Sequence, residues 1–282
     1  MVALKKLYAG AILLLVVFAT GCIGTSTDSS TSKTSSPTSA YHTENTQQWT
    51  PKTWTAYDKD LTLDREYYIG DIELTHTSKI TMNLNIFSGA NSISYLAIIP
   101  ASELEKWKED STSITYEFIT HHAKSGTYTA TLSPGKYYVL VGIADPIHKT
   151  LASGTEVIKA GEYVGVPIDL SNIVYAEKVM ATVDIREDLD INMFFTTAEE
   201  FRIYQEGGTP KIYTSYQKIK SGTYDLINGP PSYATRIGPD IYYLVLDNTY
   251  SLITTKTVDY TVTADVVYPA RVHLKIEVEE TG

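Results

Sequence analysis

The five residues Lys-Ser-Gly-Thr-Tyr occur twice in this chain of 282 residues, at 124–128 and again at 220–224. A separation of 96 positions is far longer than a solenoid repeat and is the size of a small domain. Upstream, at the same separation, REYYIGDIELT (65–75) corresponds to GEYVGVPIDLS (161–171). The chain therefore contains one folding unit twice, and both copies must adopt the same architecture.

Further segments extend the match in the same order along the chain. The alternating run ITMNLNI (80–86) corresponds to the alternating apolar positions of 179–185, and GKYYVLV (135–141) corresponds to DIYYLVL (240–246). The last pair is separated by 105 positions instead of 96, so the second copy contains an insertion, which we place at 228–236. The repeat thus spans nearly the whole unit.

Each copy consists of short alternating segments separated by turn residues. Apolar and polar residues alternate in TYTATL (127–132) and TVDYTVTADVVY (257–268), as in a strand with one buried face. Only 101–108 and 197–205 have the pattern of a short helical turn, with Ser or Thr followed by Glu and an aromatic residue. The sequence predicts an all-β fold of two tandem antiparallel jelly-roll-like β-sandwiches, each with one short helical turn.

The N-terminal segment has the composition of an export signal. Lys5 and Lys6 precede an apolar run at 7–18 that is shorter than a bilayer span, and small residues lead to the only cysteine, Cys22. The segment resembles the lipobox family, in which cleavage occurs before a cysteine that carries a lipid. Gly21-Cys22 followed by Ile23-Gly24 resembles archaeal surface lipoproteins in particular, although Ala19 stands where the family usually has Leu.

The lipobox resemblance implies a signal peptide at 1–21, a lipid on Cys22, and a protein at the cell membrane that faces the extracellular side. An uncleaved signal anchor is the alternative. Residues 22–56 are rich in Ser and Thr and poor in apolar side chains, so we expect a disordered stalk. The two sandwiches are then expected at 57–149 and 150–282.

Composition restricts the partners. The formal net charge is -10, from 33 acidic and 23 basic residues, and no basic run interrupts it, so we expect no nucleic-acid partner. A single cysteine excludes an intramolecular disulfide and a cysteine metal cage. No hydrolase, nucleotide-binding or metalloprotease motif is present, and we predict no catalytic residue and no cofactor.

Two sets of residues are candidate binding groups. Glu187, Asp188 and Asp190 could provide oxygen ligands for calcium, although a solvated turn explains the same residues. The tyrosine pairs of the repeat are candidate exposed binding aromatics for a sugar: Tyr137, Tyr138, Tyr242 and Tyr243. Because neighbouring strand residues point to opposite faces, one ring of each pair is expected in the core and the other outside.

The segments 133–141 and 242–248 also resemble two families of extracytoplasmic sandwich domains. One is the pre-peptidase C-terminal domain of secreted proteases, and the other is the Golgi-dynamics domain of p24-type cargo proteins. In these families the domain is an accessory or binding module, so the resemblance implies a protein that is not an enzyme. We therefore expect an envelope protein that binds or displays a protein or glycan partner. A structural spacer and a secreted hydrolase are the alternatives.

The two copies differ at their ends. After its Tyr-Tyr strand the second copy continues through 257–268 and 271–278, whereas the first copy has only a short segment before the second begins. The first copy thus lacks a closing strand and would have an unpaired edge. Either 271–278 returns to close the first copy, or the two final strands form a hairpin in the second.

Overall fold

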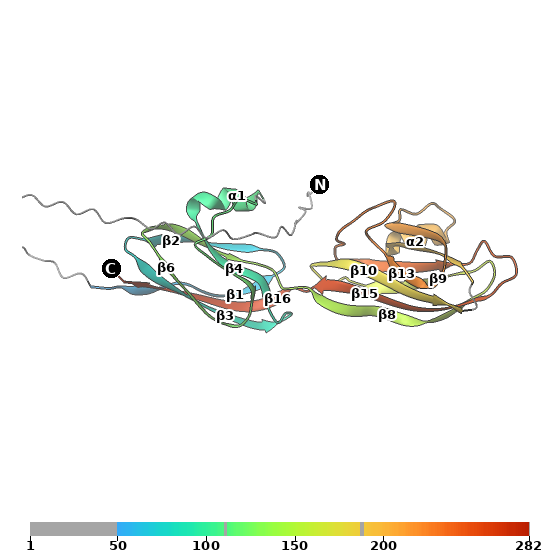
Figure 1. Cartoon of the computed structure of the whole chain (residues 1–282), viewed down its shortest axis with the longest axis horizontal. Helices are drawn as coiled ribbons and strands as arrows, with labels where there is room; N and C mark the ends of the chain where they lie inside the picture. The colour runs from blue at the N-terminus through green and yellow to red at the C-terminus, as the bar shows by residue number, and fades with distance from the viewer. Residues whose placement is uncertain (1–49, 110–111, 187–188, 282) are drawn as a thin grey trace, which may run out of the picture.

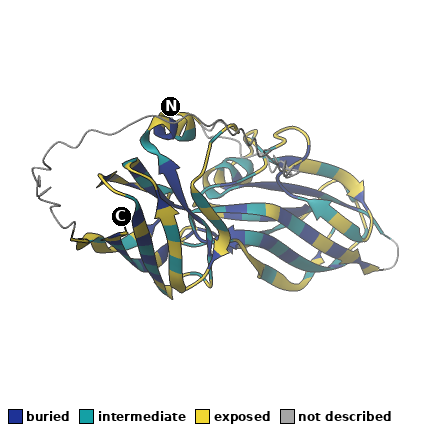
Figure 2. Ribbon diagram, turned by 60° about the vertical axis from the view of Figure 1, so that its left-hand side comes forward, coloured by how far each residue is buried: buried dark blue, intermediate teal, exposed yellow. Residues whose placement is uncertain are grey.

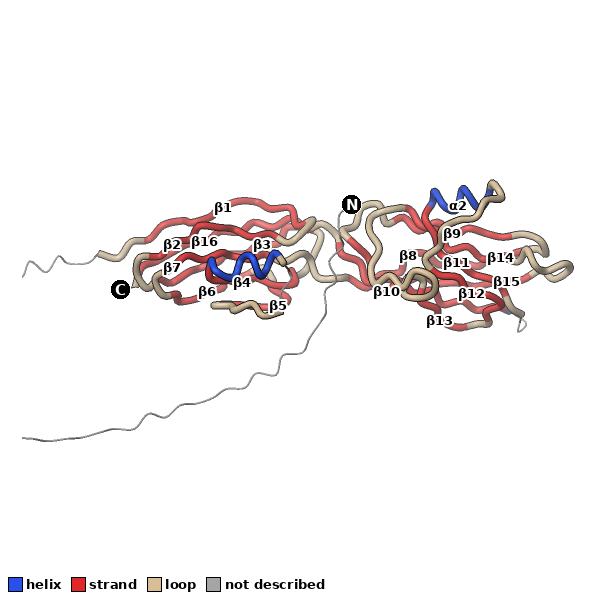
Figure 3. The backbone as a smooth tube through the Cα atoms, turned by 90° about the horizontal axis from the view of Figure 1, so that it is seen from above, coloured by secondary structure: helices blue, strands red, loops and turns tan. Residues whose placement is uncertain are grey.

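The computed structural model describes residues 50–109, 112–186 and 189–281. The expected signal peptide at 1–21, the lipidation site Cys22 and most of the stalk lie outside these residues. The described chain is almost entirely β, and it forms two sandwiches that lie end to end in Figures 1 and 3. The expected all-β class is confirmed.

The first sandwich has two four-stranded antiparallel sheets. One sheet has the order β1 (Thr53–Leu63), β16 (Ala270–Glu280), β3 (Ser78–Ser88) and β6 (Gly126–Leu132). The facing sheet has the order β2 (Tyr67–Leu74), β7 (Gly135–Val141), β4 (Ile93–Pro100) and β5 (Phe118–Ala123).

The second sandwich repeats this arrangement. Its first sheet is β8 (Ile147–Ile158), β15 (Lys256–Val267), β10 (Tyr175–Ile185) and β13 (Gly222–Asp225). Its second sheet is β9 (Tyr163–Asp169), β14 (Ile241–Asp247), β11 (Ile191–Thr197) and β12 (Thr214–Ile219). Counted within each sandwich, the strand order is 1-8-3-6 facing 2-7-4-5, which is the jelly-roll topology.

The eighth strand of the first sandwich is the last strand of the chain. β16 lies between β1 and β3, with Leu274 opposite Lys59 on one side and Leu84 on the other. The second sandwich is therefore inserted between the seventh and eighth strands of the first. Of the two predicted placements of 271–278, pairing with the first copy is confirmed.

This insertion corrects the expected boundaries. The first sandwich comprises 53–141 together with 270–280, and the second comprises 147–267, instead of 57–149 and 150–282. The stalk also ends earlier than residue 56, because β1 begins at Thr53. Without β16, both β1 and β3 would have an unpaired edge beside an apolar core, which soluble proteins avoid.

Each sandwich has its own core between its two sheets. Along β16 the inward side chains of Val272, Leu274, Ile276 and Val278 are fully buried, and the polar residues between them face outward. Figure 2 shows the same alternation of buried and more exposed positions along the strands of both sandwiches. The period-2 patterns in the sequence therefore correspond to strands with one buried face.

The KSGTY segments make the same hydrogen bonds in both copies. Ser125 Oγ accepts from Ile86 N at 2.8 Å, and Ser221 Oγ accepts from Ile185 N at 2.8 Å. Each serine fastens the turn before a short strand to the end of the strand beside it. The correspondence inferred from sequence thus holds at the level of individual atoms.

The tyrosine that ends each KSGTY segment also has one role in both copies. Tyr128 OH donates to Lys124 O and Tyr224 OH donates to Lys220 O, both at 2.7 Å. The bond closes the turn on itself over four residues. Together with the serine bonds, this bond accounts for the recurrence of Ser and Tyr in the two segments.

The two predicted helical turns are confirmed. The first is a 3-10 turn, η1 (Ala101–Glu103), followed by α1 (Leu104–Lys108), and the second is α2 (Ala198–Gln205). The aligned glutamates act alike, since Glu103 accepts from Thr115 N at 3.1 Å and Glu200 accepts from Lys211 N at 2.7 Å. Neither helix, nor any other within the described ranges, is long and apolar enough to cross a bilayer.

Candidate functional site

The first tyrosine of each Tyr-Tyr pair belongs to a core. Tyr137 and Tyr242 are 7% and 2% exposed. Their hydroxyls donate to the carbonyl four residues earlier, Ser133 O at 3.0 Å and Gly238 O at 2.9 Å. The buried hydroxyl of each ring thus has a partner, and neither ring faces solvent.

The second tyrosine of each pair is half-buried on the opposite face of its sheet. Tyr243 stacks on Phe201 of α2, with ring centroids 4.3 Å apart, and Tyr138 meets Tyr68 edge-on at 5.8 Å. The outer ring of each pair is therefore half-buried instead of exposed, and a binding role for these rings stays a prediction. Alternation correctly places the two rings of each pair on opposite faces of their sheet. The outer face is packed against α1 in the first sandwich and against α2 in the second.

Of the calcium candidates, Glu187 and Asp188 lie outside the described residues. Asp190 accepts a hydrogen bond from Tyr250 OH at 2.5 Å and pairs with Lys256 Nζ at 3.3 Å. The Tyr250 bond, and then Lys256, hold the pKa of the Asp190 carboxyl below its usual value. Nowhere in 50–109, 112–186 and 189–281 do three or more His, Cys, Asp or Glu side chains gather to hold a metal ion.

Asp190 helps to fix the loop between β14 and β15. Lys256, with a side chain only 3% exposed, also donates to the Asp190 carbonyl oxygen. Asn248 is fully buried, and its Nδ2 lies 2.8–3.2 Å from three backbone carbonyls, those of Ile158, Lys159 and Thr254. The tip of this loop carries Leu252 and Ile253, which are 91% and 92% exposed.

The outer face of the first sheet of the second sandwich collects hydroxyl and carboxylate groups. We name this set the hydroxyl face: Ser153, Thr155, Thr182, Asp184, Thr223, Asp259 and Thr261. It lies on β8, β15, β10 and β13. On β10 and β15 the intervening Val183 and Val262 are buried in the core, whereas Gly154 of β8 is exposed and Tyr260 of β15 is half-buried. Because successive strand residues point to opposite faces, the polar set must point outward.

Strand register arranges the hydroxyl face in two rows. One row runs from Ser153 through Thr261 and Thr182 to Thr223, each directly opposite the next on the neighbouring strand. In the adjacent row, Asp259 lies between Thr155 and Asp184. The residues come from four strands far apart in the sequence, so reading the chain strand by strand did not reveal them.

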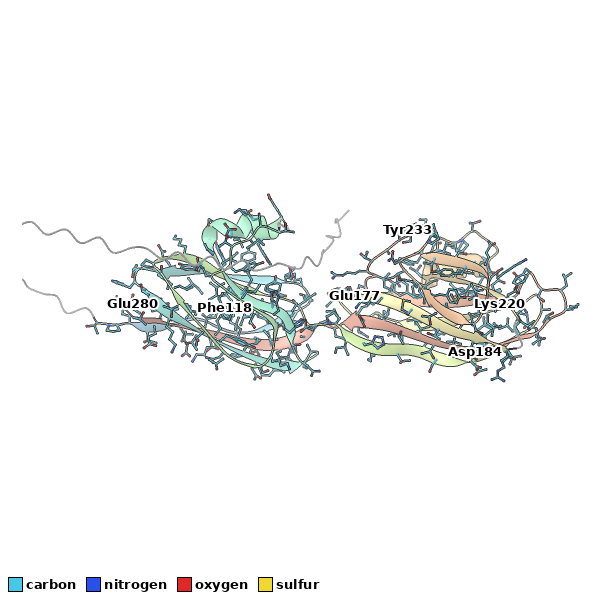
Figure 4. All side chains as sticks on the ribbon, viewed as in Figure 1. Phe118, Glu177, Asp184, Lys220, Tyr233 and Glu280 are labelled. Atoms are coloured by element: carbon cyan, nitrogen blue, oxygen red, sulfur yellow. The ribbon has the colours of Figure 1, made fainter. Side chains whose placement is uncertain are left out.

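The two carboxylates of the hydroxyl face are held in place. Arg186 Nε lies 3.3 Å from Asp259 Oδ2, and Thr155 Oγ1 donates to Asp259 Oδ1. The Thr155 bond, followed by Arg186, holds the pKa of Asp259 below its usual value. Asp184 accepts from Ser221 Oγ at 2.8 Å, and Figure 4 shows its position in the second sandwich. Both groups are thereby oriented as hydrogen-bond acceptors.

A shallow hollow of about 370 Å³ lies over this part of the sheet. Six of its lining residues belong to the hydroxyl face, and Gly154 and Tyr260 complete it. A Cβ at Gly154 would lie 2.8 Å from the Tyr260 hydroxyl, so a larger residue there would require the Tyr260 side chain to shift. The hollow offers a bound molecule hydroxyl and carboxylate oxygens on the outer face of the sheet.

No family model matches the chain, and no curated protein does either. Solved structures with some similarity include infectious bursal disease virus Gt strain (7% identity, 81% of this chain and 76% of that chain, TM-score 0.28). Another is the PBSX exported protein XepA (10% identity, 81% and 86%, TM-score 0.20). TM-scores this low support no functional inference, and the jelly-roll topology rests on the strand pairing above.

Proposed function

We propose that this chain is a lipid-anchored protein of the cell envelope, which displays its second sandwich to a ligand outside the cell and performs no catalysis. The observation that carries the proposal is the insertion of the second sandwich into the first. Glu280 N donates to Lys52 O at 2.9 Å, and Thr281 N donates to Thr77 O at 2.8 Å. The described chain therefore enters and leaves the first sandwich at the same end.

The second sandwich lies at the other end of the molecule from Glu280 (Figure 4). A stalk that leads from a lipid on Cys22 to β1 would hold the first sandwich near the membrane and direct the second outward. The apolar Leu252–Ile253 tip, on the β14–β15 loop, and the hydroxyl face both belong to this outer sandwich. They are the surfaces that a ligand in the surroundings would meet.

Two chain segments connect the sandwiches, which supports a fixed display rather than a freely swinging head. In the first connection, Gly142 N donates to Tyr95 O at 2.9 Å and Asp145 N donates to Ser92 O at 3.0 Å. The second connection is only Tyr268 and Pro269, between β15 and β16. A purely structural spacer could use the same rigidity, but an oriented, hollowed polar surface favours ligand binding.

Replacing the cysteine tests the anchor. We expect Cys22→Ser to abolish incorporation of a radiolabelled lipid precursor and to move the protein from the membrane fraction to the soluble fraction, because one chemical bond would attach the lipid. Ser26→Ala, in the stalk, serves as the control and should behave as wild type. Membrane retention of an unlabelled wild-type protein that still carries residues 1–21 would instead show a signal anchor.

Labelling in intact cells tests the display. Leu252→Cys places a thiol on a side chain that is 91% exposed, whereas Val258→Cys places one where the native side chain is fully buried. We expect a membrane-impermeant maleimide to label the first variant in intact cells and not the second. Labelling of Leu252→Cys only after cell lysis would reject an outward orientation.

A further inference from the structure

Two hydroxyls at the centre of the hydroxyl face have no partner in the described structure. Ser153 and Thr261 are directly opposite each other on β8 and β15, and neither side chain makes a hydrogen bond with another described residue. Next to them, Thr182 and Thr223 share a hydrogen bond of 3.0 Å. The hollow therefore combines unused hydroxyls with carboxylates that are already oriented.

The charges of the hydroxyl face restrict the ligand. Asp184 and Asp259 are directly opposite each other on β10 and β15, an arrangement of like charges that costs stability. Arg186, the cation beside them, is paired with Asp259. The remaining negative charge disfavours phosphates, acidic sugars and nucleic acids, and the absence of apolar side chains in the two rows disfavours lipids.

A neutral sugar is a ligand class that these charges do not exclude. Each sugar hydroxyl can donate and accept, and a carboxylate has enough lone pairs to accept from two neighbouring hydroxyls while keeping its contact with Arg186 or Ser221. Threonine and serine hydroxyls supply the complementary donors. We propose that the hydroxyl face of the second sandwich binds a neutral oligosaccharide, an inference that rests on the proposed role of this sandwich as the ligand-binding head.

The duplication provides an internal comparison. Strand pairing places Lys275 where the second sandwich has Thr261, and His273 where it has Asp259. These groups pair with others on their own face: Lys275 Nζ lies 2.8 Å from Glu277, and the His273 ring nitrogens lie 3.0 and 2.9 Å from Asp58 and Asp60. The corresponding side chains on the same face of the first sandwich are thus already paired with one another, and binding is expected in the second sandwich alone.

The test uses the full chain, purified in a detergent without a sugar headgroup. Hexasaccharides of mannose, glucose, galactose and N-acetylglucosamine are titrated by calorimetry, with hexagalacturonate as the acidic arm. We expect at least one neutral hexasaccharide to bind with a Kd of about 1 mM or tighter. Thr182→Val, Thr261→Val and Asp259→Asn should each weaken it about 10-fold, the effect of one lost hydrogen bond.

Thr127→Val is the control. It makes the same Thr-to-Val change on the corresponding face of the first sandwich, where Thr127 is the counterpart of Thr223. It should leave the affinity unchanged, and unaltered thermal unfolding should show that all variants fold. Absence of binding to every neutral hexasaccharide, preference for hexagalacturonate, loss of binding in EDTA, or equal weakening by Thr127→Val would each overturn the proposal. Because the purified chain is used, these outcomes are independent of the anchoring and labelling results.

Discussion

Deletion of residues 270–282 is expected to unfold the first sandwich while the second stays folded. The deletion removes the strand between β1 and β3, with four large aliphatic side chains that are fully buried: Val272, Leu274, Ile276 and Val278. At about 1.5–3 kcal/mol for each buried aliphatic side chain, the loss is about 6–12 kcal/mol. That is comparable to the whole free energy of unfolding of a domain, about 5–15 kcal/mol.

Hydrogen exchange measured by mass spectrometry would locate the effect. Amides in 53–141 should exchange rapidly in the truncated chain, and those in 147–267 should keep their protection, because all eight strands of the second sandwich lie between these limits. Leu274→Ala is a milder version with an expected cost of about 2–5 kcal/mol, and Glu279→Ala is its exposed control on the same strand. Loss of protection confined to 147–267 would contradict the topology.

Phe195→Ala is expected to destabilise the second sandwich by about 3–5 kcal/mol, the usual cost of removing a buried aromatic ring. Phe195 is fully buried, and its ring stacks on Tyr242 with centroids 5.3 Å apart and planes 12° from parallel. The substitution would leave a cavity in the core and remove the support of the Tyr242 ring. The first sandwich contributes no strand to this core, so its own stability should not change.

Calorimetry of the full chain can separate the two sandwiches. In Phe195→Ala, one transition should shift to lower temperature while another stays in place. Phe87→Ala, where the ring is 53% exposed, serves as the control and should shift neither by much. A single transition that shifts as a whole would show that the two sandwiches unfold as one cooperative unit, in contrast to the independence that their separate cores imply.

Local features of this protein could be read from its sequence. The tyrosine of each KSGTY segment recurs because its hydroxyl closes the turn with a bond to the lysine carbonyl four residues earlier. The alternating runs predicted strands because a sheet with one buried face needs every second residue apolar. Thr197 followed by Glu200 predicted a helix start, and the Thr197 side chain indeed accepts from Glu200 N. In each case the information lies within a few neighbouring residues.

Other features depended on the tertiary structure. The alternation in 271–278 suits either sandwich, and only the free edges of β1 and β3, more than 180 residues earlier in the chain, decide where that strand pairs. The Tyr138 and Tyr243 rings are covered because helices pack over a face that alternation alone left open. The hydroxyl face arises because strand register brings four distant segments side by side. The alternation of apolar and polar residues determines which side of a strand is buried. Which strands pair, and which elements pack over the outer face of a sheet, depend on contacts between residues far apart in the chain.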